Sequence, residues 1–252
     1  MTKKVVLGRA VRKALHVATS GVVFSVLGML PLAAFAQVST NSSPLKIGII
    51  GSGNIGSTVG TFWAKAGHQV MFSSRHPENL KTLVESVGPL ARAGTVKEAL
   101  AFGDVILIAV PYGAYPQIAK DYGKEFAGKI VMDTGNAVLA RDGEIGKEAR
   151  EKGVGLTSAR LFAGARIVRA FNTMGVRRLQ SNANRLDGRI AIPMVGEDQE
   201  ALKVASMLVR DAGFDPVILG GLERSKHFEQ GGPLYGQEIS AQEMQQRLKT
   251  LP

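Results

Sequence analysis

Short apolar segments alternate with amphipathic segments through most of the chain. The apolar segments lack a polar face, which predicts buried strands at 45–50, 69–73, near 91, and at 104–110, 129–133, 166–170, 189–195 and 215–219. Between them, apolar residues recur at helical spacing, which predicts helices after the first strand, over 77–86, 95–102 and 114–126, and from 198 to 212. This alternation predicts an α/β fold with a doubly wound, mostly parallel sheet.

The pattern also divides the chain. Residues 45–220 hold the alternation of strands and helices and are predicted to form one domain. A polar linker over 37–44 precedes it. The tail, residues 221–252, is predicted to be partly helical, with an interruption at Gly231-Gly232-Pro233.

The first 36 residues follow a different pattern. Basic residues precede an apolar stretch at Ala14–Leu32, and Ala34-Phe35-Ala36 ends the segment. This is typical of a signal peptide cleaved after Ala36, and it predicts a periplasmic or secreted protein. An uncleaved anchor is the alternative, because the stretch approaches the ~20 residues of a membrane helix. Its small and polar residues favour cleavage, and we expect no membrane contact after it.

Removal of this leader halves the net charge. Five of the 31 basic residues and none of the 21 acids precede residue 37, so the formal charge falls from +10 to +5. No run of five like charges is present, and no aromatic residues alternate with basic ones, so nucleic-acid binding is not indicated. Cysteine is absent, which excludes disulfides, thiolate catalysis and cysteine-bound metals.

Glycines follow the first strand at fixed spacing. In such a motif the first glycine permits a tight turn, the second admits phosphates, and the third lets the helix pack on the strand. The free N–H groups of the helix then bind the pyrophosphate of a dinucleotide. A chance glycine turn is the alternative, but a strand, a helix and a second strand surround the motif in the required order. The motif comprises Gly51, Ser52, Gly53, Asn54, Ile55 and Gly56.

The end of the second strand predicts which dinucleotide binds. It reads Ser73-Ser74-Arg75-His76, with no carboxylate to hold a free ribose 2′-hydroxyl. Arg75 is suited to a 2′-phosphate, and Ser73 and Ser74 add hydroxyls. We therefore expect NADP(H), with His76 near the adenine. The alternative is an ordinary polar turn before a helix.

Polar residues also follow later strands, whose carboxyl ends form the ligand crevice in such sheets. We expect the backbone after the central strand to pass the ribose and nicotinamide, an asparagine to bind the same region, and a later Asn-Thr pair to meet the substrate. Turn chemistry or a helix cap is the alternative in each case. These residues are Val110, Pro111 and Tyr112, then Asn136, then Asn172 and Thr173.

No acid–base or metal centre is indicated. After residue 36 the chain has only His68, His76 and His227, with no Ser-His-Asp arrangement and no metal-ligand cluster. We therefore name no catalytic residue. Hydride transfer between two bound redox groups depends on orientation more than on proton chemistry.

Several of these motifs together resemble one family, the NADP oxidoreductases that depend on the deazaflavin coenzyme F-420. The resemblance covers about 45–220 and implies a Rossmann NAD(P)-binding fold with hydride transfer between nicotinamide C4 and deazaflavin C5. It implies that Ser74 and Arg75 bind the 2′-phosphate, that Pro111 lies near the nicotinamide, and that Asn172 and Thr173 border the acceptor ring. The motifs are Gly51–Gly56, Ser74-Arg75, Val110-Pro111, Arg169–Met174 and Pro193–Asp198.

Other dehydrogenase families share the glycine motif but differ in their C-terminal part. Pyrroline-5-carboxylate reductases and β-hydroxyacid dehydrogenases add a long helical domain, whereas only about 40 residues follow Phe214 here. The tail is polar where the family's is apolar, so a flavin is an alternative acceptor. A non-catalytic NADP(H)-binding or interaction module is the alternative function. The expected partners are a small redox acceptor and a second copy of the chain in a homodimer.

Overall fold

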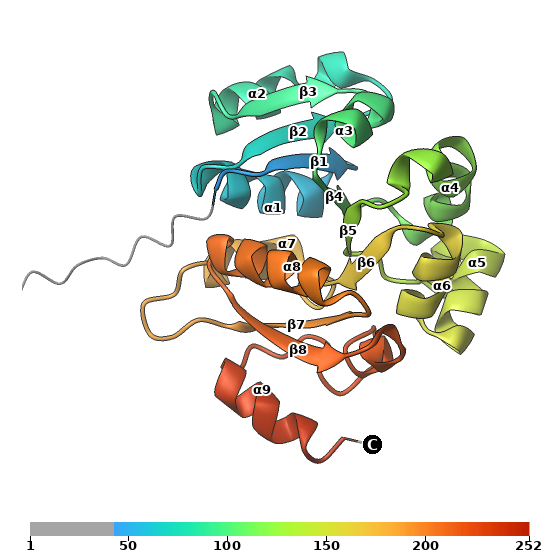
Figure 1. Ribbon diagram of the computed structural model, residues 1–252. Coiled ribbons are helices and arrows are strands. Elements are labelled where there is room, and N and C mark those ends of the chain that lie inside the picture. The colour runs from blue at the N-terminus through green and yellow to red at the C-terminus, as the bar shows by residue number, and fades with distance from the viewer. Residues whose placement is uncertain (1–42, 252) are drawn as a thin grey trace, which may run out of the picture. The chain divides into compact units, whose positions relative to one another are not determined.

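The apolar segments form one sheet in the computed structural model, which describes residues 43–251 (Figure 1). The strand order is β3-β2-β1-β4-β5-β6-β7-β8, and in the described part only β6 and β7 pair antiparallel. The order from β3 to β6 is that of a doubly wound dinucleotide-binding sheet. The predicted fold class is confirmed. The strands are β1 Lys46–Ile50, β2 Gln69–Ser73, β3 Ala91–Gly94, β4 Val105–Ile108, β5 Ile130–Asp133, β6 Arg166–Arg169, β7 Ala191–Gly196 and β8 Asp215–Gly220.

Helices cover both faces of the sheet (Figure 1). The α-helices are α1 Asn54–Lys65, α2 Lys81–Val87, α3 Val96–Phe102, α4 Tyr115–Tyr122, α5 Leu139–Lys152, α6 Val154–Leu161, α7 Val176–Asn182, α8 Gln199–Asp211 and α9 Ala241–Leu248. Short 3₁₀ helices are η1 Pro77–Leu80, η2 Tyr112–Ala114, η3 Gly123–Phe126 and η4 Leu222–His227. None of the helices in 43–251 has the length and apolar character needed to cross a bilayer.

The central strands are apolar throughout because both of their faces are buried. Successive side chains of a strand point to opposite faces. Val105 and Leu107 of β4 therefore join the core layer under α1 and α8, whereas Ile106 and Ile108 join the layer that contacts α3 and α6. All four are buried. This is the expected composition for parallel strands covered on both sides.

Several elements differ from the sequence-based expectation. The segment predicted as one helix over 114–126 is η2, α4 and η3, and the helix expected over 77–86 begins as η1. Helices α5, α6 and α7 were not predicted. The first turn of α5 is broken at Gly143, whose φ is +59°, so no continuous apolar stripe marks this helix.

The antiparallel pair has a structural reason. Strands β6 and β7 pair only through Val168 with Gly196 and Arg169 with Val195. The residues between these two strands, which include α7, lie beyond the carboxyl end of β6. Strand β7 therefore starts beyond that end and runs back alongside β6. Strand β8 then follows β7 in parallel across α8.

The tail packs onto the domain rather than forming a continuous helix. Between η4 and α9 it passes the end of β6, where Asn172 Nδ2 donates to the Phe228 carbonyl and the Gly236 N–H donates to the Thr173 carbonyl. Phe228 is fully buried. The predicted signal peptide and most of the linker lie outside the described residues.

Candidate functional site

At two of its positions, the glycine-rich turn between β1 and α1 has room only for a residue without a side chain. Gly51 has a φ of +97°, and a Cβ there would lie 2.6 Å from the Ala109 carbonyl oxygen. A Cβ on Gly56 would lie 2.0 Å from the Gly51 carbonyl oxygen. No atom of residues 43–251 lies within 4 Å of the corresponding position on Gly53. The turn is therefore closed toward the sheet and open on the side where a phosphate would approach.

The N-terminus of α1 is suited to an anion. Its N-cap is Gly53, no side chain in the described part of the chain caps it, and its first turn holds no acidic residue. By contrast, side chains cap α3, α8 and α9. The first N–H groups of a helix lack partners within the helix, and the helix dipole favours negative charge there. Asn54, Ile55 and Gly56 thus present the donors that a pyrophosphate requires.

The serines after β2 have different roles in the structure. Ser73 is buried and its Oγ donates to the Ile49 carbonyl at 2.7 Å, which ties β2 to β1. Ser52 Oγ donates to the Ser73 carbonyl at 3.0 Å, which joins the glycine turn to the end of β2. Ser74 is half-buried, and its Oγ accepts from the His76 N–H at 3.0 Å. The Ser74 hydroxyl is therefore the more accessible of the two.

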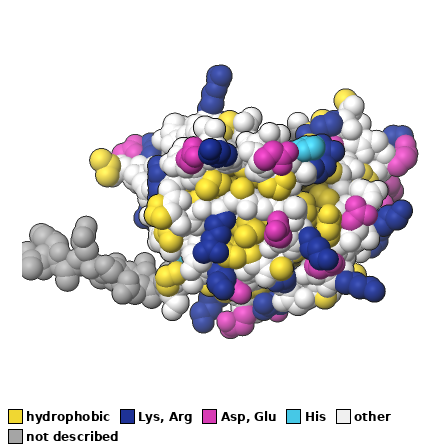
Figure 2. Space-filling view, turned by 90° about the horizontal axis from the view of Figure 1, so that it is seen from above, with side chains coloured by type: hydrophobic (Ala, Val, Ile, Leu, Met, Phe, Trp, Pro, Cys, Tyr) yellow, Lys and Arg dark blue, Asp and Glu magenta, His cyan; other side chains and the backbone are white. Residues whose placement is uncertain are grey.

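Arg75 is an available cation at this strand end. Its side chain is exposed and makes no hydrogen bond or ion pair with any other residue in the described range 43–251. Glu78 is close in sequence but contacts His76 Nδ1 at 3.1 Å instead. Figure 2, which views the molecule from above Figure 1, shows apolar, basic and acidic side chains together on that face. The guanidinium is thus free to pair with a phosphate.

A cavity of about 690 Å³ joins these parts. Its lining includes eight of the residues singled out from the sequence, namely Gly51, Ser52, Gly53, Ser73, Ser74, Arg75, Val110 and Pro111. Sequence reasoning missed the rest of the lining, which is Ile50, Leu80, Val96, Ala114, Gln117, Ile118, Asp121 and Tyr122. The apolar members form walls suited to a planar base. Ile118 and Tyr122 share one face of α4 at a spacing of four, which is a signal that the sequence offered.

Tyr112 lies away from the cavity. Its side chain is fully buried, and its Oη lies 3.1 Å from Ser158 Oγ. The ring packs on Tyr115 with centroids 4.4 Å apart. Burial, with Asp133 nearby, raises the pKa of the Tyr112 phenol. Tyr112 therefore anchors its loop to α6, and its neighbours Val110, Pro111 and Ala114 line the cavity.

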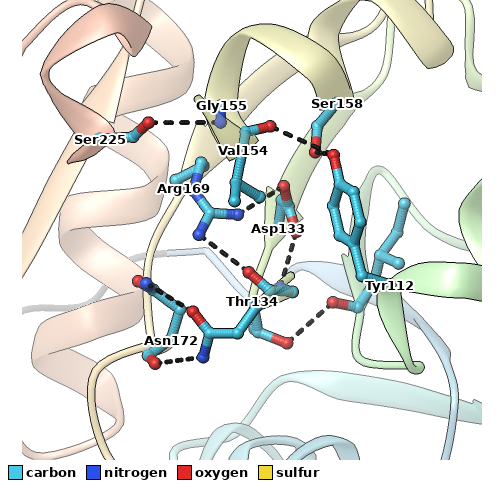
Figure 3. Close-up of polar contacts among 12 residues, drawn as sticks. Tyr112, Asp133, Thr134, Val154, Gly155, Ser158, Arg169, Asn172 and Ser225 are labelled. Atoms are coloured by element: carbon cyan, nitrogen blue, oxygen red, sulfur yellow. Dashed lines mark hydrogen bonds and ion pairs between the residues drawn. The ribbon is translucent and has the colours of Figure 1, made fainter. Parts of the chain in front are cut away.

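A buried ion pair holds the turn after β5 (Figure 3). Arg169 Nη1 lies 2.8 Å from Asp133 Oδ2, and Arg169 Nη2 donates to the Gly135 carbonyl at 2.9 Å. Asp133 Oδ1 accepts from Tyr115 Oη at 2.7 Å and from the Gly135 N–H at 2.8 Å. Burial opposes the charge of Arg169, but the Asp133 and Glu229 carboxylates keep its pKa above the ordinary value. The network sets the position of Asn136.

Asn136 and Asn172 bind each other. Asn136 Nδ2 donates to the Asn172 carbonyl at 2.7 Å, and Asn172 Nδ2 donates to Asn136 Oδ1 at 3.3 Å (Figure 3). Asn136 is half-buried, whereas Asn172 and Thr173 are 3% and 2% exposed beneath the tail. None of the three lines the cavity. Asn172 Oδ1 and Thr173 Oγ1 are buried without a hydrogen-bond partner in the described chain.

The histidines of the described chain lie outside the cavity lining. His68 is buried, with Nδ1 accepting from the Leu45 N–H and Nε2 lying 2.9 Å from Asp211. His76 is exposed beside Glu78. Partial burial and Arg224 lower the pKa of His227. Within 43–251, no three His, Cys, Asp or Glu side chains are placed to hold a metal ion.

Comparison with known families agrees with this geometry. Residues 46–137 match the family described as NADP oxidoreductase coenzyme F420-dependent. This confirms the resemblance inferred from the motifs, over a stretch that is less than half of the chain. The match includes the glycine turn, Arg75 and the loop at Pro111.

Individual relatives extend the similarity to most of the described chain. The metalloreductase STEAP3 of Rattus norvegicus is 28% identical over 184 residues, which cover 73% of this chain but 36% of that protein. A hypothetical protein from Sinorhizobium meliloti superposes with a TM-score of 0.66 at 28% identity, covering 78% of this chain and 95% of that one.

A third relative supports the fold alone. A structure from Arthrobacter sp., described as an F420-dependent NADP-reductase, has a TM-score of 0.60 at 21% identity. It covers 71% of this chain and 86% of its own.

Proposed function

We propose that the protein is an NADP(H)-dependent oxidoreductase that transfers a hydride between the nicotinamide and a flavin or deazaflavin acceptor. One observation supports this most directly. One cavity joins the N-terminus of α1 to Arg75 at the end of β2, and within residues 43–251 no side chain caps that helix or pairs with that arginine. These two features correspond to the two phosphate positions of NADP.

In this proposal, each part of the dinucleotide meets residues that line or adjoin the cavity. The N–H groups of Asn54, Ile55 and Gly56 would bind the pyrophosphate, and Arg75 with Ser74 would bind the 2′-phosphate. The apolar walls on η1, α3 and α4 would enclose the adenine. Pro111 would pass the ribose and nicotinamide, with Asn136 beyond it. When bound, NADPH supplies the hydride, and the chain orients it and excludes water.

The proposal is tested with the purified chain lacking residues 1–36. Binding of NADPH and NADH is measured by the change in nicotinamide fluorescence, and hydride transfer to FMN, FAD and a deazaflavin is followed by absorbance. We expect tighter binding of NADPH than of NADH and reduction of at least one acceptor. A chain that binds neither dinucleotide would contradict the proposal.

A specific observation favours a second candidate, a non-catalytic NADP(H)-binding module. Asn172 and Thr173, which the family resemblance places at the acceptor ring, lie beneath the tail and are nearly inaccessible. In that case NADPH would bind tightly, but no acceptor would be reduced. A ferric chelate belongs in the same screen, because the name of the rat relative indicates a metal as the electron acceptor.

Three further expectations remain proposals. We propose export, with cleavage after Ala36, and a second copy of the chain as partner in a homodimer. Cell fractionation with N-terminal sequencing of the recovered protein tests export and cleavage. Sedimentation of the purified protein tests the homodimer.

A further inference from the structure

We propose that Asp142 is a positioning residue that holds together the two strand-end loops beside the nicotinamide. This inference rests on the proposed function, because it assumes that NADP(H) binds in the cavity. The loops follow β4 and β5, and they contain Pro111 and Asn136 respectively. Sequence reasoning did not single out Asp142.

The Asp142 carboxylate bonds to the backbone of both loops. Its Oδ1 accepts from the Gly113 N–H at 3.0 Å, and its Oδ2 accepts from the Val138 N–H at 2.7 Å. Gly113 lies two residues after Pro111, and Val138 lies two residues after Asn136. Among the side chains of residues 43–251, no other one hydrogen-bonds the backbone of both loops.

Arg141 pairs with Asp142 and adds a third contact with the loops. We refer to these two side chains as the clamp. The Arg141 Nε and Nη2 donate to the two oxygens of Asp142 at 2.6 and 2.8 Å. Its Nη2 also donates to the Asn136 carbonyl at 3.0 Å. The pair thus binds the loop after β4 once and the turn after β5 twice.

The burial of the Asp142 side chain and the backbone conformation beside it support this role. It is fully buried, so each N–H it binds would lose its partner if the carboxylate were removed. Gly143 follows it with a φ of +59°, a conformation that favours glycine and turns the rest of α5 away. The first turn of α5 therefore presents Asp142 to the two loops independently of the helix body.

The position of the clamp predicts which half of the dinucleotide it affects. The pyrophosphate and 2′-phosphate positions depend on α1 and Arg75, which Asp142 does not contact. Under the proposed function, the nicotinamide lies between the two loops that Asp142 joins. Loss of the clamp should therefore weaken the nicotinamide half and leave the adenosine half unchanged.

Asp142→Asn tests this, because asparagine keeps the shape but places an NH₂ group against one of the two backbone donors. The ligands are NADPH and adenosine 2′,5′-bisphosphate, which carries only the adenosine half with its 2′-phosphate. We expect NADPH binding to weaken about tenfold, as for loss of one charged hydrogen bond, and bisphosphate binding to change less than about twofold. Where an acceptor is reduced, kcat should fall more than KM rises.

Two further variants serve as a control and as a milder version of the same change. Glu148→Gln lies on the same helix, where Glu148 pairs with Lys152 and Arg160, and it should leave both ligands unaffected. Arg141→Ala removes only the exposed part of the clamp and should give a smaller loss in the same direction, should Asp142→Asn fail to fold. Equal losses for both ligands, or no loss for NADPH, would overturn the inference. Wild-type protein that binds neither ligand would instead overturn the proposed function.

Discussion

At the scale of single residues, the structure separates side chains that face the cavity from those that only adjoin it in sequence. Arg75, Ser74 and Pro111 line the cavity as their positions at strand ends predict. Tyr112 follows Pro111 directly but points into the core. A strand end can be identified from the pattern of apolar residues, but the direction of a side chain in the following turn depends on packing against α6, which is distant in sequence.

Arg75→Ala should reduce NADPH affinity and leave NADH affinity nearly unchanged. The guanidinium has no partner in the described chain. Its removal therefore leaves no carboxylate without a partner and should not affect folding. Loss of a charge-assisted contact with the 2′-phosphate is expected to weaken NADPH binding about tenfold or more. Titration of both dinucleotides checks this. Arg177→Ala is the control, because Arg177 is also exposed but lies on α7. Equal losses for the two dinucleotides would contradict a phosphate-binding role.

Arg169→Met should destabilise the protein strongly. Methionine approximates the length of the side chain but leaves the Asp133 carboxylate buried without its ion-pair partner. Removal of one partner of a buried pair typically costs about 3–5 kcal/mol. Urea unfolding measures the change. Arg166→Met on the same strand is the control, because Arg166 is partly exposed and lies 3.8 Å from Asp198. A loss below about 1 kcal/mol would show that the pair adds little to stability.

At the scale of elements, local signals in the sequence account for α1, α3 and α8 but not for α5 to α7. Thr95 and Asp198 begin α3 and α8 as side-chain caps, and Gly67 follows α1 with a φ of +101°. The direction of β7 had no local signal, because it depends on where the chain re-enters the sheet after α7. The parallel core was predictable because burial on both faces makes its strands continuously apolar.

The cap of α3 predicts a pH dependence. The Thr95 N–H and hydroxyl both donate to Glu98, and these bonds lower the pKa of its carboxyl group. A depressed pKa in the fold means that the contribution to stability is present above the unfolded value, near 4.5, and is lost as the pH falls through the folded value. Glu98→Gln should therefore destabilise the protein more at pH 7 than at about pH 3.

Unfolding of both proteins by urea at the two pH values measures this difference. Glu85→Gln on α2 is a control, because within residues 43–251 Glu85 forms one ion pair, with Lys81 at 3.9 Å. A difference between Glu98→Gln and wild type that stays constant with pH would show that the ionised carboxylate does not stabilise the cap.

At the scale of the whole described chain, the packing of the tail differs most from what the sequence predicts. Residues 221–252 were expected as a partly helical appendage, whereas η4, Phe228 and Leu234 belong to the core layer that contacts α6. The glycines at 231 and 232 break the helical pattern as expected. The pattern does not reveal that the broken segment passes the end of β6 and covers Asn172. That contact joins residues 56 positions apart in sequence.

Phe228→Ala should show that the tail is part of the folded unit. The ring is fully buried, so its removal leaves a cavity and should lower the free energy of unfolding by about 3–5 kcal/mol. The variant should also expose Asn172, whose side-chain amide donates to the Phe228 carbonyl, and thereby quicken hydrogen exchange at 172 and 173. Gln242→Ala, at an exposed position of α9, should change neither quantity. Exchange that quickens throughout the sheet would indicate global unfolding, whereas exchange confined to these strand ends would mean that the tail opens as a local unit over the proposed acceptor position.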